Sequence, residues 1–163
     1  MALTAEQLFV LNHMNSKSRH VLLGNLLHRA PAIYKAKYDF SVHGGAVGSI
    51  SLDDDVGDLS NPLGTVNASI PNKFVVYGGF IDIVTTLTSG GAATIAVGLN
   101  TTTDIKAATA VASWTAGIMA IVPVATAASA VKLTADREVV ITVATAALTA
   151  GKFFVHLFGQ LGD

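Results

Sequence analysis

The sequence predicts a mainly β protein, a jelly-roll-like β-sandwich or barrel that carries an N-terminal α-helical arm. The apolar residues follow a helical period up to Pro31 and a period of two after it. Short strands and turn residues then continue to the C-terminus, without the strand–helix alternation of doubly wound folds. We therefore expect a helical arm over residues 1–30 and a β-sandwich domain over residues 31–163.

The arm begins with a helix-start signal. Thr4 followed by Gln7 is typical of a capping box, in which each side chain satisfies a backbone donor of the first turn. The residue before Pro31 is pushed out of the α basin, so the helical region ends there. Its second half carries an apolar stripe that Gly24 weakens. The stripe consists of Leu22, Leu23, Leu26 and Leu27.

The first expected strand covers residues 34–42, because apolar and polar residues alternate there. We expect one face to hold Tyr34, Ala36, Tyr38, Phe40 and Val42, and the other to hold Lys35, Lys37, Asp39 and Ser41. A turn at His43-Gly44-Gly45, a short strand over residues 47–52 and a polar loop over residues 53–64 follow.

A long strand over residues 74–87 is apolar on both faces, which predicts burial on both sides by the fold itself or by a neighbouring subunit. Gly78-Gly79 in its middle indicates a bulge or sharp bend. Asp82 on the same strand needs a partner if its face is buried. We expect a hairpin turn at Ser89-Gly90-Gly91 and another turn at Thr149-Ala150-Gly151, before a final strand that contains His156.

Composition narrows the class of function. Only 13% of the residues are charged, about half the usual quarter, which indicates surfaces covered by neighbours. The net charge of −1 creates no field that would recruit nucleic acid or an anionic membrane. The chain has no cysteine, which excludes disulfides, thiol catalysis and cysteine-ligated zinc. The N-terminus does not read as a signal peptide.

The 25 residues between Lys106 and Lys132 carry no charge, which is long enough to span a bilayer. They are mostly small or weakly apolar and contain Gly117 and Pro123. We expect a buried or partner-covered β segment. A membrane-associated protein that uses residues 107–131 is an alternative.

The motifs in the sequence indicate neither an enzyme nor a cofactor. Asp53, Asp54, Asp55 and Asp58 share one loop, but their spacing fails the EF-hand pattern, so we expect a solvated loop. The histidines form no HExxH or HxH motif, and no GxSxG nucleophile motif occurs. His156 alternates with phenylalanines and is interpreted as a structural residue. No catalytic, cofactor or metal residues are therefore predicted.

Two sets of contact residues are predicted instead. The basic and leucine-rich part of the arm is the candidate for docking on a partner, although it could also fold back on its own domain. The docking set is Lys17, Arg19, Leu22, Leu23, Leu26, Leu27 and Arg29. The candidate oligomer interface comprises Phe74, Val76, Phe80, Val84 and Trp114.

Two segments carry a family resemblance. Residues 69–100 read SIPNKFVVYGGFIDIVTTLTSGGAATIAVGLN, and residues 131–157 read VKLTADREVVITVATAALTAGKFFVHL. Both resemble small virion proteins of tailed bacteriophages, and the likeness covers residues 65–160. It implies a jelly-roll or sandwich oligomer, often a trimer, that sits on the major capsid lattice as a decoration (cement) protein, a head fibre or a related component. It supplies no catalytic residues.

We therefore expect a capsid decoration protein, located in the virion and assembled in the host cytoplasm. Its expected partners are itself, as a homo-oligomer and in particular a trimer, and the major capsid protein or another virion protein. No direct contact with nucleic acid or membrane is expected. The alternative from another class is a carbohydrate-binding, host-recognition β-sandwich of a phage fibre or tail. An exposed aromatic platform around Trp114 or Tyr77 would favour that alternative.

Overall fold

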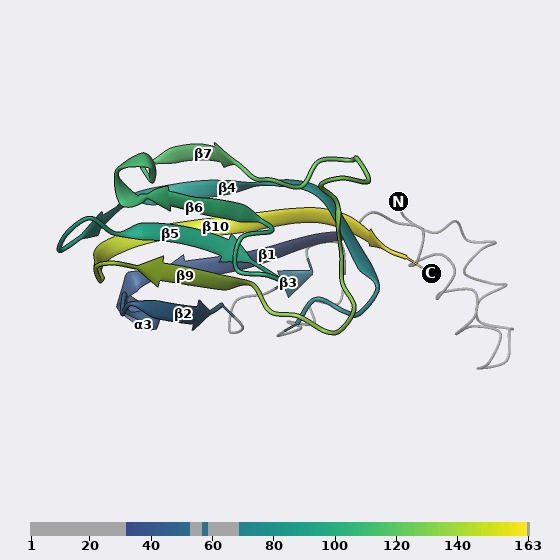
Figure 1. Ribbon diagram of the computed structural model, residues 1–163, viewed down its shortest axis with the longest axis horizontal. Helices are drawn as coiled ribbons and strands as arrows, with labels where there is room; N and C mark the ends of the chain where they lie inside the picture. The colour runs from purple at the N-terminus through teal and green to yellow at the C-terminus, as the bar shows by residue number, and fades with distance from the viewer. Residues whose placement is uncertain (1–31, 53–56, 59–68, 163) are drawn as a thin grey trace, which may run out of the picture. The chain divides into compact units, whose positions relative to one another are not determined.

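The computed structural model describes residues 32–52, 57–58 and 69–162. The predicted helical arm, including its docking residues, lies outside the described residues, and so do residues 53–56 and 59–68 of the polar loop. The described part is mainly β, as expected, and consists of two antiparallel sheets (Figure 1).

The larger sheet, called sheet A, has six strands, and the smaller one, sheet B, has four. Sheet A has the order β3 (Gly57–Asp58), β1 (Ala32–Asp39), β10 (Leu148–Leu161), β4 (Phe74–Ser89) and β7 (Gly117–Ala120), with β8 (Val131–Lys132) also paired to β4. Sheet B has the order β2 (Gly48–Ser51), β9 (Val140–Ala144), β5 (Thr94–Gly98) and β6 (Lys106–Ala110). A helical turn, α3 (Phe40–His43), and a 3₁₀ turn, η2 (Val111–Ser113), connect strands.

The strands pair in a nested order, because the first pairs with the last and the second with the one before the last. The nested pairs are β1–β10, β2–β9, β4–β7 and β5–β6. The pairs β10–β4 and β9–β5 then join them into the two sheets.

The core lies between the sheets and is built by the alternation that the sequence predicts. Tyr34, Ala36 and Tyr38 of β1 are buried, while Lys35 and Lys37 between them are only partly buried. The other large core side chains include Phe74, Ile81, Ile95, Trp114, Ile141, Phe153 and Leu157. Each such side chain stabilises the fold by roughly 1.5–3 kcal/mol through the apolar surface it removes from water.

The bulge expected in the long strand is confirmed. Gly78 pairs with Phe158 and Val76 with Gly159, so Tyr77 is one extra residue on β4. The extra residue reverses which side chains point inward: Val76 is buried before it and Ile81 after it. Through this change of phase, Phe74 and Val76 before the bulge and Ile81 and Ile83 after it all face the core, whereas Phe80 and Val84 face outward.

Three sequence expectations about turns and strand ends are wrong. The first strand ends at Asp39 because the Asp39 carboxylate accepts a hydrogen bond from the Ser41 amide (3.1 Å) and caps the α3 turn. Val42, expected on the core face, is 62% exposed as a result.

The segment Ser89-Gly90-Gly91 is not a hairpin, because β4 belongs to sheet A whereas β5 belongs to sheet B. It carries the chain from one sheet to the other. Thr149-Ala150-Gly151 lies inside β10, where the register slips and Gly151 has a φ of 137°. The turn falls earlier, next to Thr145, whose φ is 73°.

Candidate interaction surfaces

The five residues of the predicted oligomer interface divide between the core and the surface. Phe74, Val76 and Trp114 are buried inside the subunit's own core, so they have no surface to give to a partner. Phe80 is partly exposed and Val84 is 52% exposed, and both point away from the core. The oligomer interface itself stays a prediction.

Trp114 is a core residue and not a sugar-binding platform. Its indole ring lies 5.2 Å from the ring of Phe153. Its Nε1–H donates a hydrogen bond to Oγ1 of Thr109 at 3.0 Å, which satisfies the polar edge of a fully buried side chain. One of the two residues that would have supported carbohydrate binding is therefore inaccessible, and the other, Tyr77, is the partly buried bulge residue.

An aromatic cluster covers the outer side of sheet A. The buried residues Phe153, Val155 and Leu157 of β10 alternate with outward-facing ones, and the pairing brings Phe80 of β4 opposite His156. The rings of Phe80 and His156 stack at 4.5 Å with an interplanar angle of 18°. We call this surface the aromatic face; it consists of Lys35, Phe80, Phe154, His156 and Phe158, which are all partly exposed.

The aromatic face combines apolar rings with a cation. The ring of Phe158 meets Phe80 edge to face at 5.8 Å. The ammonium of Lys35 lies 3.8 Å from the centroid of the Phe154 ring, in cation–π geometry. A surface of this kind can bind an apolar or aromatic partner and still place a positive charge at the contact.

The stacked histidine remains neutral to lower pH than a free one. Partial burial lowers the pKa of His156, the nearby Lys35 charge lowers it further, and Asp82 acts in the opposite direction. Asp82, which needed a partner if buried, is partly exposed on this side of the sheet, between Phe154 and Ile118 in the strand pairing.

A second surface follows the uncharged segment. Residues 107–131 leave sheet B through β6, pass through η2 and form the edge of sheet A as β7. Figure 1 shows β6 and β7 near each other on one side of the domain, and Lys106 Nζ donates to the Ala120 carbonyl at 3.0 Å. These residues form strands, a 3₁₀ turn and loops instead of a spanning helix. We call this surface the uncharged side.

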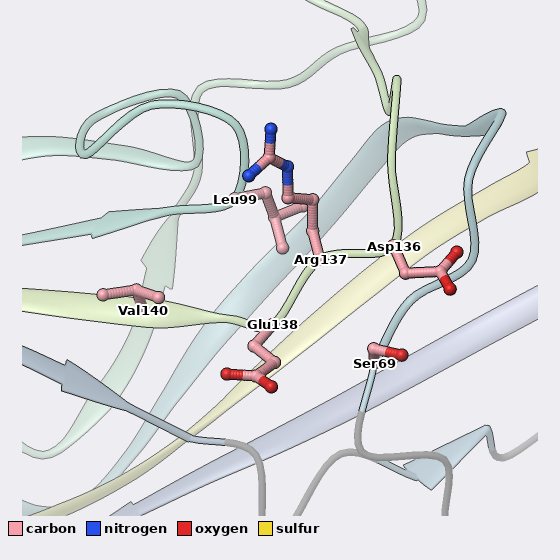
Figure 2. Close-up of a pocket in the computed structure, with 6 residues that line it drawn as sticks. All are labelled: Ser69, Leu99, Asp136, Arg137, Glu138 and Val140. Atoms are coloured by element: carbon pink, nitrogen blue, oxygen red, sulfur yellow. The ribbon is translucent and has the colours of Figure 1, made fainter.

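A pocket of about 380 Å³ opens at the end of sheet B. It is lined by Ser69, Leu99, Asp136, Arg137, Glu138 and Val140. Figure 2 shows the Arg137 guanidinium, the Asp136 carboxylate and the Glu138 carboxylate pointing in three different directions. The three charged groups therefore do not converge on one point in the pocket.

The acidic groups of the pocket already have structural partners. One oxygen of Asp136 accepts the Asn72 amide at 2.8 Å, and one oxygen of Glu138 accepts the Ser51 hydroxyl at 2.6 Å. The backbone amides of Arg137 and Ile70 each donate a hydrogen bond to the carbonyl oxygen of the other residue. These hydrogen bonds attach the segment that precedes β9 to neighbouring segments, so the two carboxylates have a structural role.

Within residues 32–52, 57–58 and 69–162, no group of three or more histidine, aspartate or glutamate residues is placed to hold a metal ion. The described part also contains no helix with the length and hydrophobicity of a membrane span. Asp58 pairs with Tyr34 as part of β3, whereas Asp53, Asp54 and Asp55 lie outside the described residues.

Comparison with known proteins gives one informative match. No protein-family model matches the chain, and no curated protein matches it. The fold is similar to a chain in the acidic stable capsid structure of Helicobacter pylori bacteriophage KHP30, with a TM-score of 0.51 and 15% sequence identity. The match covers 83% of this chain and 91% of that chain. The likeness is one of fold.

The sequence contains one signal for the aromatic face, which is the alternation of Phe154, His156 and Phe158 with buried residues. That alternation alone predicts a structural role for His156 and does not show a surface. The partner Phe80 could not be assigned, because the bulge at Tyr77 changes which residues of β4 face outward.

Proposed function

We propose that the chain is a structural, non-enzymatic subunit of a phage particle, and specifically a decoration (cement) protein on the capsid lattice. The observation that carries this proposal is the shared fold with a chain of a phage capsid structure. The match spans 83% of this chain and 91% of that chain, so the likeness covers most of both.

We further propose that the sandwich is a jelly roll. Four nested antiparallel pairs, split between two sheets in the orders β1-β10-β4-β7 and β2-β9-β5-β6, support this interpretation. Jelly rolls are double-sheet folds built from two Greek keys and are common in capsid proteins. The two short strands β3 and β8 are additions at the borders of sheet A.

A cement protein needs broad surfaces that contact several subunits at once. The aromatic face offers one such surface, and its composition is that of an interface centre, where aromatic residues are enriched. We assign this face to the capsid. When a subunit has bound one capsid protein, its second contact forms with a capsid protein that is already close by, at a high effective concentration. Two weak contacts can therefore hold a small protein firmly on a lattice.

The geometry of the pocket around Arg137 supports the non-enzymatic part of the proposal. Its charged side chains diverge (Figure 2), and both carboxylates hold structural hydrogen bonds. General acid–base or nucleophilic catalysis requires groups that converge on one reacting atom. The pocket offers no such arrangement.

Gold-labelled antibodies against the chain would test the role on purified particles of the phage that encodes it. A decoration protein predicts label over the whole head, together with a stoichiometric band in gels of intact particles. Label at the tail or fibre tips would instead support the host-recognition alternative. A chain that is absent from washed particles would contradict both roles.

The assignment of the aromatic face can be tested by co-sedimentation with capsids stripped of the protein. Phe154→Asp should weaken binding by about tenfold or more, since a hot-spot residue at an interface centre contributes about 2 kcal/mol or more. Val47→Asp is the control, because Val47 is 55% exposed and lies outside the aromatic face. Equal loss of binding in both variants would contradict the assignment.

A further inference from the structure

The uncharged side is unusually open for a segment that carries no charge. Of the 25 residues from 107 to 131, 16 are exposed and only two, Trp114 and Pro123, are buried. The exposed ones include Ile118 at 69%, Val124 at 53% and Val122 at 43%. The sequence predicted a buried or partner-covered segment, and the subunit's own fold does not bury it.

The same side presents two sheet edges. β7 ends sheet A and is paired only with β4, and β6 ends sheet B and is paired only with β5. Proteins usually protect such edges with charged residues or proline, because an open edge can pair with another chain. Here β7 is Gly-Ile-Met-Ala and carries neither, and β6 carries one charged residue, Lys106, at its first position.

The apolar surface extends from the uncharged side onto sheet A. Asp82 pairs with Ile118 across β4 and β7, so Val84, two residues further along β4, lies diagonal to Ile118 on the same outer face. Val84 is 52% exposed and belongs to the predicted oligomer interface. In the sequence the charged residues that border the segment are Lys106 and Lys132 at its two ends, and in the structure Asp82 also borders it, opposite Ile118.

We propose that the uncharged side packs against a second copy of the chain. Its size fits, because its 16 exposed and seven partly exposed residues match the about 20–30 residues that a standard protein interface takes from each partner. Its lack of charge fits as well, because a charged partner surface would lose its hydration here without gaining an opposite charge. A second copy brings a surface of the same length and the same neutrality. This interface forms whether or not the chain is a virion subunit.

The first test measures the mass of the full-length chain in solution by light scattering after size-exclusion chromatography. The wild-type chain should elute as a multiple of 16.8 kDa at micromolar concentration. Ile118→Glu and Val124→Glu should weaken self-association by about a hundredfold or more, since each buries an unpaired charge. Val47→Glu is the matched control, with an exposure of 55% against 53% for Val124, and should leave the mass unchanged.

A cross-linking test does not depend on how the charged variants fold. The chain has no cysteine, so Ile118→Cys introduces a single thiol. A short bis-maleimide should then link copies through position 118, whereas Val47→Cys should stay unlinked. Circular dichroism of each variant checks that the fold is retained.

Three results would overturn the proposal: a wild-type monomer at micromolar concentration, charged variants that keep the oligomer mass, or cross-linking that is no stronger at 118 than at 47. A monomer whose Ile118→Glu variant loses capsid binding would assign this side to a capsid protein instead. Loss of label from particles with an intact oligomer would contradict the virion role alone, so the two failures are distinguishable.

Discussion

The imidazole ring of His156 lies flat on the ring of Phe80, 4.5 Å away, in the middle of the aromatic face. Each ring covers part of the other, so the stack holds in place two side chains that the core does not reach. The pKa of His156 reports directly on this environment, because partial burial is the main cause of its decrease.

We predict that the pKa of His156 lies below the ordinary histidine value of about 6.5. We also predict that Lys35 and Asp82 shift this pKa in opposite directions. Lys35→Gln should raise the pKa of His156, and Asp82→Asn should lower it, because each removes one of the two charges acting on the ring. Ring-proton NMR of the three proteins measures this. A shift of the same sign in both variants would contradict the proposed cause.

The same shift has a consequence for stability. Because the folded state holds His156 neutral, its contribution is fully present above the unfolded pKa and is lost as pH falls toward the folded pKa. The unfolding free energy of wild type minus that of His156→Phe should therefore decrease as pH falls below about 6.5. Denaturant titrations at several pH values test this, and a difference that stays constant with pH would refute it.

Asp39 is predicted to remain ionised to unusually low pH. The pKa of Asp39 is lowered to about 2, first by the Ser41 hydroxyl and then by Lys152, whose Nζ lies 3.2 Å from Oδ2. Ser41→Ala and Lys152→Gln should therefore each raise this pKa. Carboxyl ¹³C NMR distinguishes the two effects. The contribution of ionised Asp39 to the free energy of unfolding is present above the pKa of Asp39 in the unfolded chain and is lost as pH falls toward 2.

Gly79→Ala should destabilise the fold by about 2 kcal/mol or more. Gly79 has a φ of 150°, and a Cβ there would collide with the His156 carbonyl oxygen and crowd Ile121. Gly90→Ala is the control, because a Cβ at Gly90 meets nothing within 4 Å. Thermal melts of both variants measure the difference, and equal melting temperatures would show that the bulge is not constrained.

Trp114 should behave as a core residue in every assay. As the single tryptophan of the chain, it should give blue-shifted fluorescence that soluble glycans do not quench. Trp114→Ala should cost about 3–5 kcal/mol. Thr109→Val should cost about 1–3 kcal/mol, because it leaves the buried indole N–H without its acceptor. Glycan-dependent quenching would restore the carbohydrate-binding alternative.

Alternation predicted the mainly β fold and much of the core, because burial follows a period of two in β1 and β10. Tyr34, Ala36 and Tyr38 point inward as expected, and so do Phe153 and Val155. What periodicity could not give was the partner of each strand. The segment 89–91 has the composition of a hairpin turn, yet it crosses between sheets, since local turn chemistry does not encode which strand lies across the domain.

The candidate surfaces were only partly predictable for the same reason. Phe74, Val76 and Trp114 are as apolar as Phe80 and Val84, and only the bulge at Tyr77 and the pairing of β4 decide which of them reach the surface. The uncharged segment was recognisable from composition alone. Its placement along two adjacent sheet edges required the structure.

The nested pairing has a consequence for how the protein is made. Ala32 at the start of β1 pairs with Gly159 near the end of β10, so β1 lacks this partner strand until residues 148–161 have been synthesised. Sheet A therefore closes only after β10 has emerged from the ribosome, and Tyr34 and Tyr38 stay uncovered until then. A nascent chain that is stalled before β10 should be cut by protease along β1. A chain in which β10 has left the ribosome should be protected there.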